Sequence, residues 1–464
     1  MQTLDQLLVA ARRCYGSGDD EAAKAAYLEV LKLDPCDSRA LSELGALALA
    51  SNHRSAARTA YQQAVRCHPG SPAALVDLGN LELQDRNGAD ARSHFEAAVK
   101  LDANFAPAHQ GLARVLTEAG ERAAAAVHLR LGFSGHALTR MPFLGEGSAL
   151  RVLLLVATHY GNVSTREFLD NRQFEILVLY AEYFDAEQAL PAHDVVFNAI
   201  GDAELCAHAL RAAQQVLHRS TAPIINTPEA VLQSTRLNNA QRLGNLTGVV
   251  SAATWRVERA QLSAFAARRA ARFPMLLRSP GFHMGSHFVR VPHSAELLSA
   301  AAGLPGDELL AMEFLDARGA DGMTRKYRVM IIDGELFPLH LAIASDWKVH
   351  YFSAAMASEP TYREEERRFL DDMPAVLGEA ALEALLRVST ELQLDYAGID
   401  FGLRPDGTVL LFEANATMVI APPPPDPMWD YRRPAIERAR QAALALLHKR
   451  GLETGAAGRE TPRD

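Results

Sequence analysis

Three side chains with oxygen donors lie close together in DYAGIDFGLRPDGTVLLFEANATM, near the C-terminal end of the sequence. Asp400, Glu413 and Asn415 interrupt segments that are otherwise almost continuously apolar. Glu413 and Asn415 are two residues apart, so on a strand they share one face. Carboxylate and amide oxygens are the ligands that Mg²⁺ prefers, and we predict a magnesium site here. The alternative is a solvent-facing edge strand, but its charges would alternate with apolar residues.

The two apolar segments flank RPDG, whose Pro, Asp and Gly favour a tight reversal, and we predict a β-hairpin. If Asp406 and Gly407 form a two-residue loop, Asp400 lies directly opposite Glu413. A bulged turn that begins at Pro405 would shift this register by one residue.

The segment FPMLLRSPGFHMGSHFVRV is predicted to be a strand, a glycine-containing loop and a second strand. Gly281 and Gly285 carry no side chain, so the loop amides could approach phosphate oxygens closely. Arg278, at the end of the first strand, would add a fixed positive charge. Taken alone, the segment is explained equally well as a plain β-hairpin.

A second group of basic residues lies in RKYRV and in the segment that follows Trp347. On a strand, Arg328 shares its face with Lys326, whereas Arg325 points away. Lys348 and His350 form another alternating pair. Each could be a solvated surface charge, but their position beside apolar strands favours a cleft that neutralises a Mg²⁺ triphosphate.

The elements that would position these residues follow an N-terminal region with a period of 34 residues. Aromatic residues and alanines recur at this spacing, at Tyr27, Tyr61 and Phe95 and at Ala23, Ala57, Ala91 and Ala125. The pattern resembles the tetratricopeptide repeat, whose helical pairs stack into a solenoid that binds peptide or protein on its concave face. The unit from about residue 106 departs from it at His109 and Leu129 and is predicted to be a capping or divergent unit. An Ala-rich helical bundle is the alternative.

We therefore expect a multidomain protein in which an all-α tetratricopeptide solenoid (1–135) and a linker (136–150) precede two further domains. Strands alternating with helices predict a small α/β domain over 151–230, and antiparallel strands with helices predict an α+β domain over 231–450. Residues 451–464 are expected to be a disordered tail.

Composition excludes several classes of protein. The chain has 464 residues and a formal net charge of -9, which argues against binding to nucleic acid or to an anionic membrane. Its apolar runs have strand length and no basic leader precedes them, so we expect no membrane span and a cytoplasmic protein. The 4 cysteines are scattered and are expected to be buried thiols, and the 16 histidines form no zinc motif. The sequence leaves a homodimer open.

The ordered series INTPEAV, FPMLLR, AMEFLD, RKYRV, GID and EAN resembles the ATP-grasp superfamily over about residues 151–445. The layout is similar to that of D-alanine:D-alanine ligases and of the glutamate ligases that extend ribosomal proteins. The resemblance implies a pre-ATP-grasp domain at 151–230, an ATP-grasp catalytic domain at 231–450, and ATP and Mg²⁺ as cofactors.

The resemblance also implies roles for individual residues. It assigns Mg²⁺ to Asp400, Glu413 and Asn415. It assigns ATP to a hinge that contains Glu313, Phe314 and Leu315, to the loop with Gly281 and Gly285, and to the basic residues Arg236, Arg278, Lys326, Arg328 and Lys348.

This sequence departs from the family at two places. Arg278 and, approximately, Arg236 stand where the family has lysine, which keeps the charge but changes its reach. After Asn415 the sequence runs ATMVIAPPPP, where D-alanine ligases have Asn-x-x-Pro-Gly, which argues against D-alanine as the substrate.

The expected activity is ATP-dependent ligation of a carboxylate to an amine through an acyl phosphate. Arg328, Lys348 and His350 are the candidate catalytic residues, with His350 a candidate base for the amine. The substrate would be an amino acid, a peptide or a carrier-bound peptide, recruited through the repeats. Two alternatives remain: a kinase on the same scaffold, and a non-catalytic tetratricopeptide scaffold with a relic nucleotide site.

Overall fold

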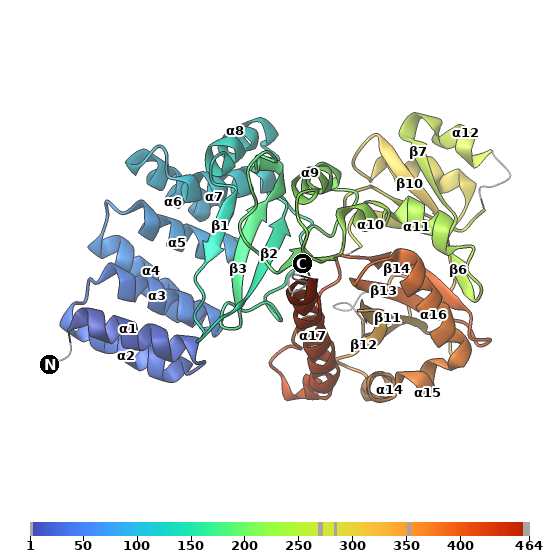
Figure 1. The fold of residues 1–464 in the computed structure, drawn as a ribbon. Coiled ribbons are helices and arrows are strands. Elements are labelled where there is room, and N and C mark those ends of the chain that lie inside the picture. Colours follow the sequence, from blue (N-terminus) through green and yellow to red (C-terminus); the bar gives the residue numbers. More distant parts are fainter. Residues whose placement is uncertain (1–2, 268–271, 283–284, 350–353, 458–464) are drawn as a thin grey trace, which may run out of the picture. The chain divides into compact units, whose positions relative to one another are not determined.

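The computed structural model describes residues 3–267, 272–282, 285–349 and 354–457 (Figure 1). Its internal contacts divide the chain into two compact units. The N-terminal unit comprises Met1–Leu154 and Asp170–His193, and the C-terminal unit comprises Leu155–Leu169 and Asp194–Asp464. Each unit is described separately.

Eight helices of the described residues form four antiparallel pairs in the N-terminal unit: α1 (Leu4–Gly16), α2 (Asp20–Leu33), α3 (Ser38–Ala50), α4 (Arg54–Cys67), α5 (Pro72–Gln84), α6 (Gly88–Leu101), α7 (Ala106–Glu118) and α8 (Arg122–Phe133). Glycine makes the crossings possible, because a Cβ at Gly45 would lie 2.3 Å from the ring of Tyr61. Phe95 is held between two such positions, Gly79 and Gly111. The 34-residue spacing of aromatic and small residues therefore places the rings of Tyr61 and Phe95 against glycines of neighbouring helices.

The fourth helical pair replaces an apolar contact with a contact between two histidines. His109 is 2 % exposed, and its Nδ1 lies 2.8 Å from Nδ1 of His128. Its Nε2 lies 2.9 Å from the backbone oxygen of Ala103 and must donate to it. Nδ1 of His109 is therefore the acceptor, and His128 donates the shared proton. This unit is a divergent member of the array, as its sequence indicates.

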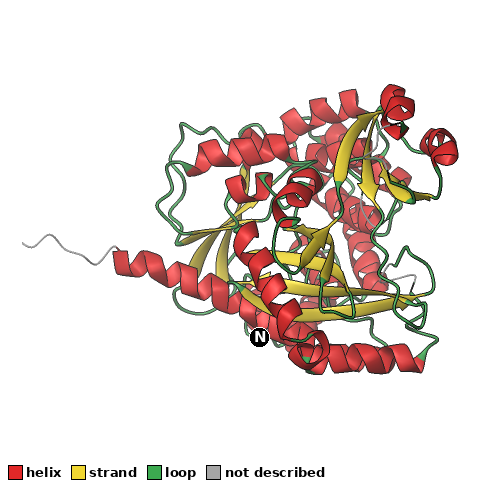
Figure 2. Cartoon of the chain, turned by 90° about the vertical axis from the view of Figure 1, so that its right-hand side faces the viewer, coloured by secondary structure: helices red, strands yellow, loops and turns green. Residues whose placement is uncertain are grey.

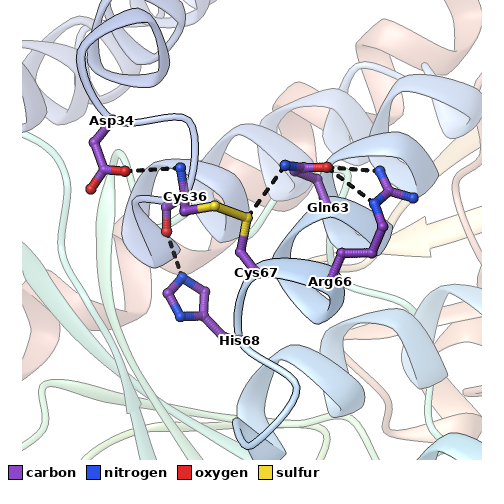
Figure 3. Close-up of a disulfide and its surroundings, with 6 residues drawn as sticks. All are labelled: Asp34, Cys36, Gln63, Arg66, Cys67 and His68. Carbon is purple, nitrogen blue, oxygen red and sulfur yellow. Dashed lines mark hydrogen bonds between the residues drawn. A yellow bond between two sulfur atoms is a disulfide. The ribbon is translucent and has the colours of Figure 1, made fainter.

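A disulfide joins Cys36, after α2, to Cys67, the last residue of α4 (Figure 3). Buried thiols were expected, and for these two residues that expectation is wrong, since Cys36 is exposed. Cys14 and Cys206 are free thiols, and Cys206 is buried. Sequence spacing missed the bond because the two cysteines follow different repeats, and stacking brings together the ends of those repeats. Such bonds persist mainly in oxidising compartments, which argues against the predicted cytoplasmic location.

The N-terminal unit also contains β1 (Leu138–Met141), β3 (Phe174–Tyr180) and η1 (Ala181–Tyr183), and β1 pairs antiparallel with β3. The ring of Phe133 in α8 packs against Tyr180, with 4.4 Å between centroids. At the other end of the array, Arg172 forms an ion pair of 2.7 Å with Asp20. Both ends of the repeat array therefore contact the segment that carries β3. Strand β2 (Leu150–Val156) spans the border between the units.

The C-terminal unit is a mixed α/β region (Figures 1 and 2). It begins with β4 (Val195–Asn198), α9 (Ala207–Leu217), β5 (Ile224–Ile225), α10 (Pro228–Leu232) and α11 (Arg236–Leu243). Strands β4 and β5 are parallel. Thr227 and Thr235 cap α10 and α11, and the hydroxyl oxygen of each accepts a hydrogen bond from a backbone amide of the first turn.

A four-stranded sheet with the order β7-β10-β8-β9 follows. Its elements are β7 (Thr254–Glu258), η2 (Arg259–Gln261), α12 (Leu262–Ala266), β8 (Met275–Arg278), β9 (Phe288–Val291), η3 (Ser294–Glu296), α13 (Leu297–Ala302) and β10 (Glu308–Glu313). Its pairings are antiparallel. Buried side chains of α12, α13 and the strands form one core cluster, which includes Leu262, Met275 and Leu297.

A five-stranded sheet has the order β12-β11-β13-β14-β6. Its elements are β6 (Val249–Ser251), β11 (Thr324–Ile332), β12 (Glu335–Ala344), α14 (Pro360–Asp371), α15 (Met373–Leu377), α16 (Glu379–Leu392), β13 (Tyr396–Leu403), β14 (Val409–Asn415), η4 (Pro427–Arg432) and α17 (Arg433–Ala457). Strand β13 lies in the middle, and its residues from Tyr396 to Gly402 are buried. Helix α17 continues beyond residue 450, where the tail was expected to begin.

We expect the fourth helical pair to lose stability in acid. Burial and the neighbouring His109 lower the pKa of His128, while Glu96 raises it and Arg92 lowers it. The unfolded chain therefore takes up this proton first, and stability falls as pH drops below about 6.5, by at most about 1.4 kcal/mol per pH unit for one histidine. Amide hydrogen exchange of α7 and α8 at pH 7, 6 and 5 measures this.

His128→Gln should flatten the pH dependence, whereas the exposed His136 provides the matched control as His136→Gln. Equal slopes for the wild type and His128→Gln would contradict the assignment.

Candidate functional site

A cavity of about 710 Å³ lies within the C-terminal unit. Strands from both sheets line it, together with the segments that follow β2, β4 and β14. One group of its lining residues is charged or amidic, and we call it the polar wall: Arg278, Lys326, Arg328, Lys348, Asp400, Glu413 and Asn415. The cavity therefore brings together most of the candidate residues that the sequence indicates. Its volume lies in the usual range for small-molecule sites.

The β13–β14 hairpin sets Asp400 opposite Glu413, as the sequence predicts. The turn itself is not the expected two-residue loop, because Leu403 pairs with Val409 and Arg404 N donates to Thr408 O. That register differs by one residue from the expected one. A β-bulge beside Phe401 then restores it before Asp400 is reached. The bulge places an additional residue in β14 and aims Glu413 into the cavity.

Asp400 is the most constrained charge of the polar wall. It is 3 % exposed, and Arg328 binds it through two bonds, Nε to Oδ1 at 2.6 Å and Nη2 to Oδ2 at 2.8 Å. Lys326 Nζ donates to Oδ2 at 2.9 Å. Burial acts to raise the pKa of Asp400, but Arg328 and Lys326 outweigh it and hold that pKa well below the usual range. Asp400 is therefore ionised throughout the physiological pH range.

The alternation of β11 separates the basic residues into two groups. Lys326 and Arg328 line the cavity, whereas Arg325 pairs with Asp321 at 2.8 Å and with Glu365. These pairings raise the pKa of Arg325. Arg325 is thus directed away from the polar wall and provides a matched control for Arg328.

Arg236 connects the polar wall to the segment after β4. Its Nη1 donates to Glu204 and its Nη2 to Glu413, each at 2.7 Å. Burial raises the pKa of Glu413, but the charges of Arg236 and Arg278 outweigh it and lower the pKa. The sequence resemblance suggested only a nucleotide contact for Arg236. The pairing with Glu413 was missed because 177 residues separate the two positions.

Arg278 ends β8 beside the loop 279–287, of which the structure describes all but residues 283–284. It is 8 % exposed, and its Nη2 donates to the backbone oxygen of Phe282. Its Nε is buried and has no hydrogen-bond partner among the described residues. Burial and the nearby charge of Arg236 lower the pKa of Arg278 to about 10. A buried cation with a free donor is suited to bind an anion.

The two candidate glycines of this loop have φ values of 76° at Gly281 and 70° at Gly285. A Cβ at Gly285 would lie 2.7 Å from Cε of Lys348. Lys348 Nζ lies 3.3 Å from the backbone oxygen of Phe288, to which it donates. The positive φ favours glycine at position 285, where the loop passes the lysine. His350, the candidate base, lies outside the described residues.

The candidate hinge follows the end of β10. Glu313, Phe314 and Leu315 line the cavity, and Glu313 N donates to Ala253 O at 2.8 Å. Phe314 packs edge-on against Trp347, at 6.1 Å between ring centroids. Phe288 packs against the same indole at 5.4 Å. These three rings give the cavity an aromatic side that could receive a flat heterocycle.

His340 is a lining residue that sequence reasoning missed. It pairs with Arg328 across β11 and β12, and a register shift follows because Val329 pairs with Pro338. Burial and the charge of Arg328 lower the pKa of His340 well below its ordinary value, so the imidazole is neutral at physiological pH. Pro338 inside a strand was the available signal, because proline in a sheet marks an irregularity.

The oxygen donors are of the type that Mg²⁺ prefers. Asp400, Glu413 and Asn415 line one cavity, and Glu413 uses only Oε1 in its ion pair with Arg236. Asp400 is fully ion-paired, and Asn415 Oδ1 accepts two hydrogen bonds from Thr417. The described residues contain no group of three acids, histidines or cysteines arranged to hold a metal. The set therefore suits an ion that arrives with phosphate oxygens of its own.

The segment after β14 is anchored by a buried ion pair between helix α14 and η4. Glu366 is fully buried and Arg432 is 2 % exposed, and their atoms Oε2 and Nη2 lie 2.6 Å apart. Glu366 also accepts from the backbone nitrogen of Leu341 at 3.2 Å. Trp429 covers the guanidinium at 4.0 Å. The pair fixes the end of a proline-rich loop whose Pro422 and Pro424 line the cavity.

Comparison with known families identifies the N-terminal helices. The tetratricopeptide repeat model matches residues 8–72 and 43–109. The first part of the chain is therefore a tetratricopeptide-repeat region, followed by a mixed α/β region. Repeats of this kind commonly mediate contacts between proteins.

Several solved structures are similar to part of this chain. A crystal structure of MamA is 23% identical, covers 29% of this chain and 74% of that chain, and has a TM-score of 0.25. MamA 41-end from Desulfovibrio magneticus RS-1 is 24% identical, with 27% and 72% covered and a TM-score of 0.25. A structure from the functional characterisation of Pseudomonas aeruginosa pilF is 20% identical, with 28% and 60% covered and a TM-score of 0.26. No curated protein matches the chain.

Within the part of the chain that the structure describes, no helix combines the length and the apolar character needed to cross a bilayer.

We expect Arg432→Met to destabilise the C-terminal unit by about 3 to 5 kcal/mol, because it leaves Glu366 as an uncompensated buried carboxylate. The double variant Glu366→Gln with Arg432→Met should recover much of this loss. Urea denaturation monitored by tryptophan fluorescence measures the free energy of unfolding of each variant.

Arg433→Ala is the matched control, because the adjacent Arg433 is 51% exposed in its pair with Asp430. It should change stability by less than about 1 kcal/mol. If the double variant is as unstable as Arg432→Met alone, the uncompensated charge of Glu366 is not the cause of the instability.

Proposed function

We propose that the C-terminal unit is an ATP-dependent carboxylate–amine ligase of the ATP-grasp type. One observation carries the proposal: basic residues and oxygen donors that are distant in sequence line a single cavity beside a glycine loop. The ordered motifs of the sequence support the same assignment. A carboxylate would be phosphorylated by ATP, and an amine would displace phosphate from the acyl phosphate to form an amide, with ADP and phosphate released.

The residues of the polar wall have separable tasks in this reaction. Arg278 brings a buried charge and a free Nε to the phosphate end. Asp400 orients Arg328 through two bonds, so the guanidinium is preorganised. Glu413 and Asn415, with Asp400, would hold Mg²⁺, which when bound supplies neutralisation of phosphate charge.

The cavity also favours ligation through proximity. Holding two substrates side by side can lower the barrier by about 7 to 11 kcal/mol when their geometry is good. The neutral imidazole of His340 lies at the cavity, and the second candidate base, His350, belongs to a segment outside the described residues.

The repeat region is proposed to recruit a peptide or a carrier protein that bears one substrate. Linkage of this kind raises the effective concentration of the reactive end. A tetratricopeptide scaffold without catalysis is the alternative that the family match supports by itself. The set of three donors and four cations around one cavity favours an enzyme over a relic.

Incubation of the full chain with ATP, Mg²⁺ and pooled amino acids and peptides tests the proposal by mass spectrometry. A new amide together with ADP supports a ligase, and a phosphorylated product would instead identify a kinase. Binding of Mg-ATP without any product would favour the alternative of a non-catalytic tetratricopeptide scaffold.

Glu413→Gln and Asn415→Ala are each expected to lower ADP release at least about a hundredfold, since each removes an oxygen donor. Neither opens a core cavity, so the thermal unfolding transition should move by only a few degrees. A coupled assay for ADP measures the effect, and full turnover by Glu413→Gln would refute the metal assignment.

Arg278→Ala and Arg328→Ala are expected to weaken binding of a non-hydrolysable ATP analogue about tenfold or more, because each removes a charge-assisted hydrogen bond. Arg325→Ala should have little effect, since Arg325 is paired elsewhere. Isothermal titration calorimetry on folded variants decides, and equal losses at positions 325 and 328 would rule out this geometry.

A further inference from the structure

One side of the cavity differs in character from the polar wall. We call it the apolar wall and define it by Tyr160, Leu205, Val419, Pro422, Pro424 and Ile436. These residues come from the segments after β2, β4 and β14 and from the start of α17, all within the C-terminal unit.

Two residues of the apolar wall are unusually exposed for their type. Tyr160 is 48% exposed and Leu205 is 47% exposed. Other large apolar residues are also exposed in this unit, such as Leu298, but they do not line the cavity. Tyr160 and Leu205 both line the cavity, and covering their apolar area with a ligand would contribute favourably to binding.

The backbone under these residues is held in place. Cys206 Sγ lies 2.8 Å from the backbone oxygen of Tyr160. Leu205 N donates to Oδ1 of Asp202 at 2.8 Å, and Glu204 N donates to the same oxygen. Asp202 is 4 % exposed. This carboxylate therefore fixes the position of Leu205, and the wall is preorganised to receive an apolar group.

The apolar wall begins next to the glycine loop. A Cβ placed on Gly281 would lie 2.8 Å from Cδ2 of Leu205. Because the loop follows Arg278, a group that packs on Leu205 lies beside the anion-binding end of the polar wall. In a ligase, this is where the reacting carboxylate and amine must meet.

The proline run makes this side of the cavity poor in hydrogen-bond donors. Residues 422–425 are four consecutive prolines, none of which has a backbone N–H. A charged or strongly polar group placed there would lose its water without gaining hydrogen bonds from these residues.

We infer that the acid or the amine substrate carries an uncharged aliphatic or aromatic side chain next to its reacting group, and that this side chain packs on the apolar wall. The inference rests on the proposed ligase activity. It names the substrate class as apolar amino acids, or peptides whose reacting terminal residue is apolar. The site would select apolar substrates, because contact with the apolar wall stabilises an apolar side chain and leaves a charged one without hydrogen bonds.

The test uses the full chain and two matched panels of amino acids and dipeptides, one with Leu, Val or Phe and one with Glu or Lys at the reacting end. ADP release should show a kcat/KM at least about tenfold higher for the apolar panel, within the range expected for apolar pockets. A preference for the charged panel, or no stimulation by either panel although Mg-ATP binds, overturns the inference.

Leu205→Glu should raise the KM of the apolar panel about tenfold or more, and by a larger factor than it raises the Kd of Mg-ATP. Leu298→Glu introduces the same charge at a position that is 56% exposed and lies outside the cavity, so it should leave both constants unchanged. Equal effects of the two variants on KM would exclude a role for the apolar wall.

Calorimetry distinguishes failure of the proposed ligase function from failure of the inference about the apolar wall. Absence of Mg-ATP binding refutes the proposed function, and binding of Leu- or Phe-containing dipeptides without nucleotide then tests the apolar wall by itself. If these dipeptides bind and Leu205→Glu weakens them, the apolar wall stands without the ligase. If they do not bind, the inference fails as well.

Discussion

The buried charge of Asp400 is the constraint on which the arrangement of the C-terminal unit depends. A carboxylate that is 3 % exposed in the central strand of a sheet needs permanent cationic partners. Strand β11 supplies them as Lys326 and Arg328 on one face. Across the other edge of β13, the bulge in β14 sets Glu413 opposite Asp400. The second carboxylate is kept ionised by a different cation, Arg236, so the two acids do not compete for one partner.

The same principle explains why two sides of one cavity differ. On the polar wall, Asp400 and Glu413 are each held by cations from a neighbouring strand or helix, which fixes the positions of these carboxylates. The proline-rich loop of the apolar wall is held from outside the cavity, because the ion pair of Glu366 and Arg432 fixes its end. In such a cavity the polar wall would orient an anion, and the apolar wall would bind an apolar group.

Local pattern was enough to predict the elements and much of the polar wall. The period of 34 residues predicted the helical pairs, and the alternation in RKYRV predicted that Arg325 and Arg328 face opposite sides. Pattern failed where partners are distant. The pairing of Arg236 with Glu413 and the disulfide of Cys36 with Cys67 depend on tertiary packing. The bulge that restores the register at Asp400 lies between β13 and β14, and no dipeptide in the sequence signals it.

Arg278 differs from the other arginines that line this cavity in having no carboxylate partner among the described residues. Lys326 and Arg328 satisfy Asp400, and Arg236 satisfies Glu204 and Glu413, so their desolvation is compensated within the fold. Arg278 has only a backbone oxygen for its Nη2 and none of the described carboxylates as an ion-pair partner, and its pKa is lowered accordingly. A cation kept buried at this cost gains most from a ligand that brings negative charge. Arg278 precedes the glycine loop, and Gly281 of that loop lies against Leu205 of the apolar wall, so an anion and an apolar group can be bound side by side there.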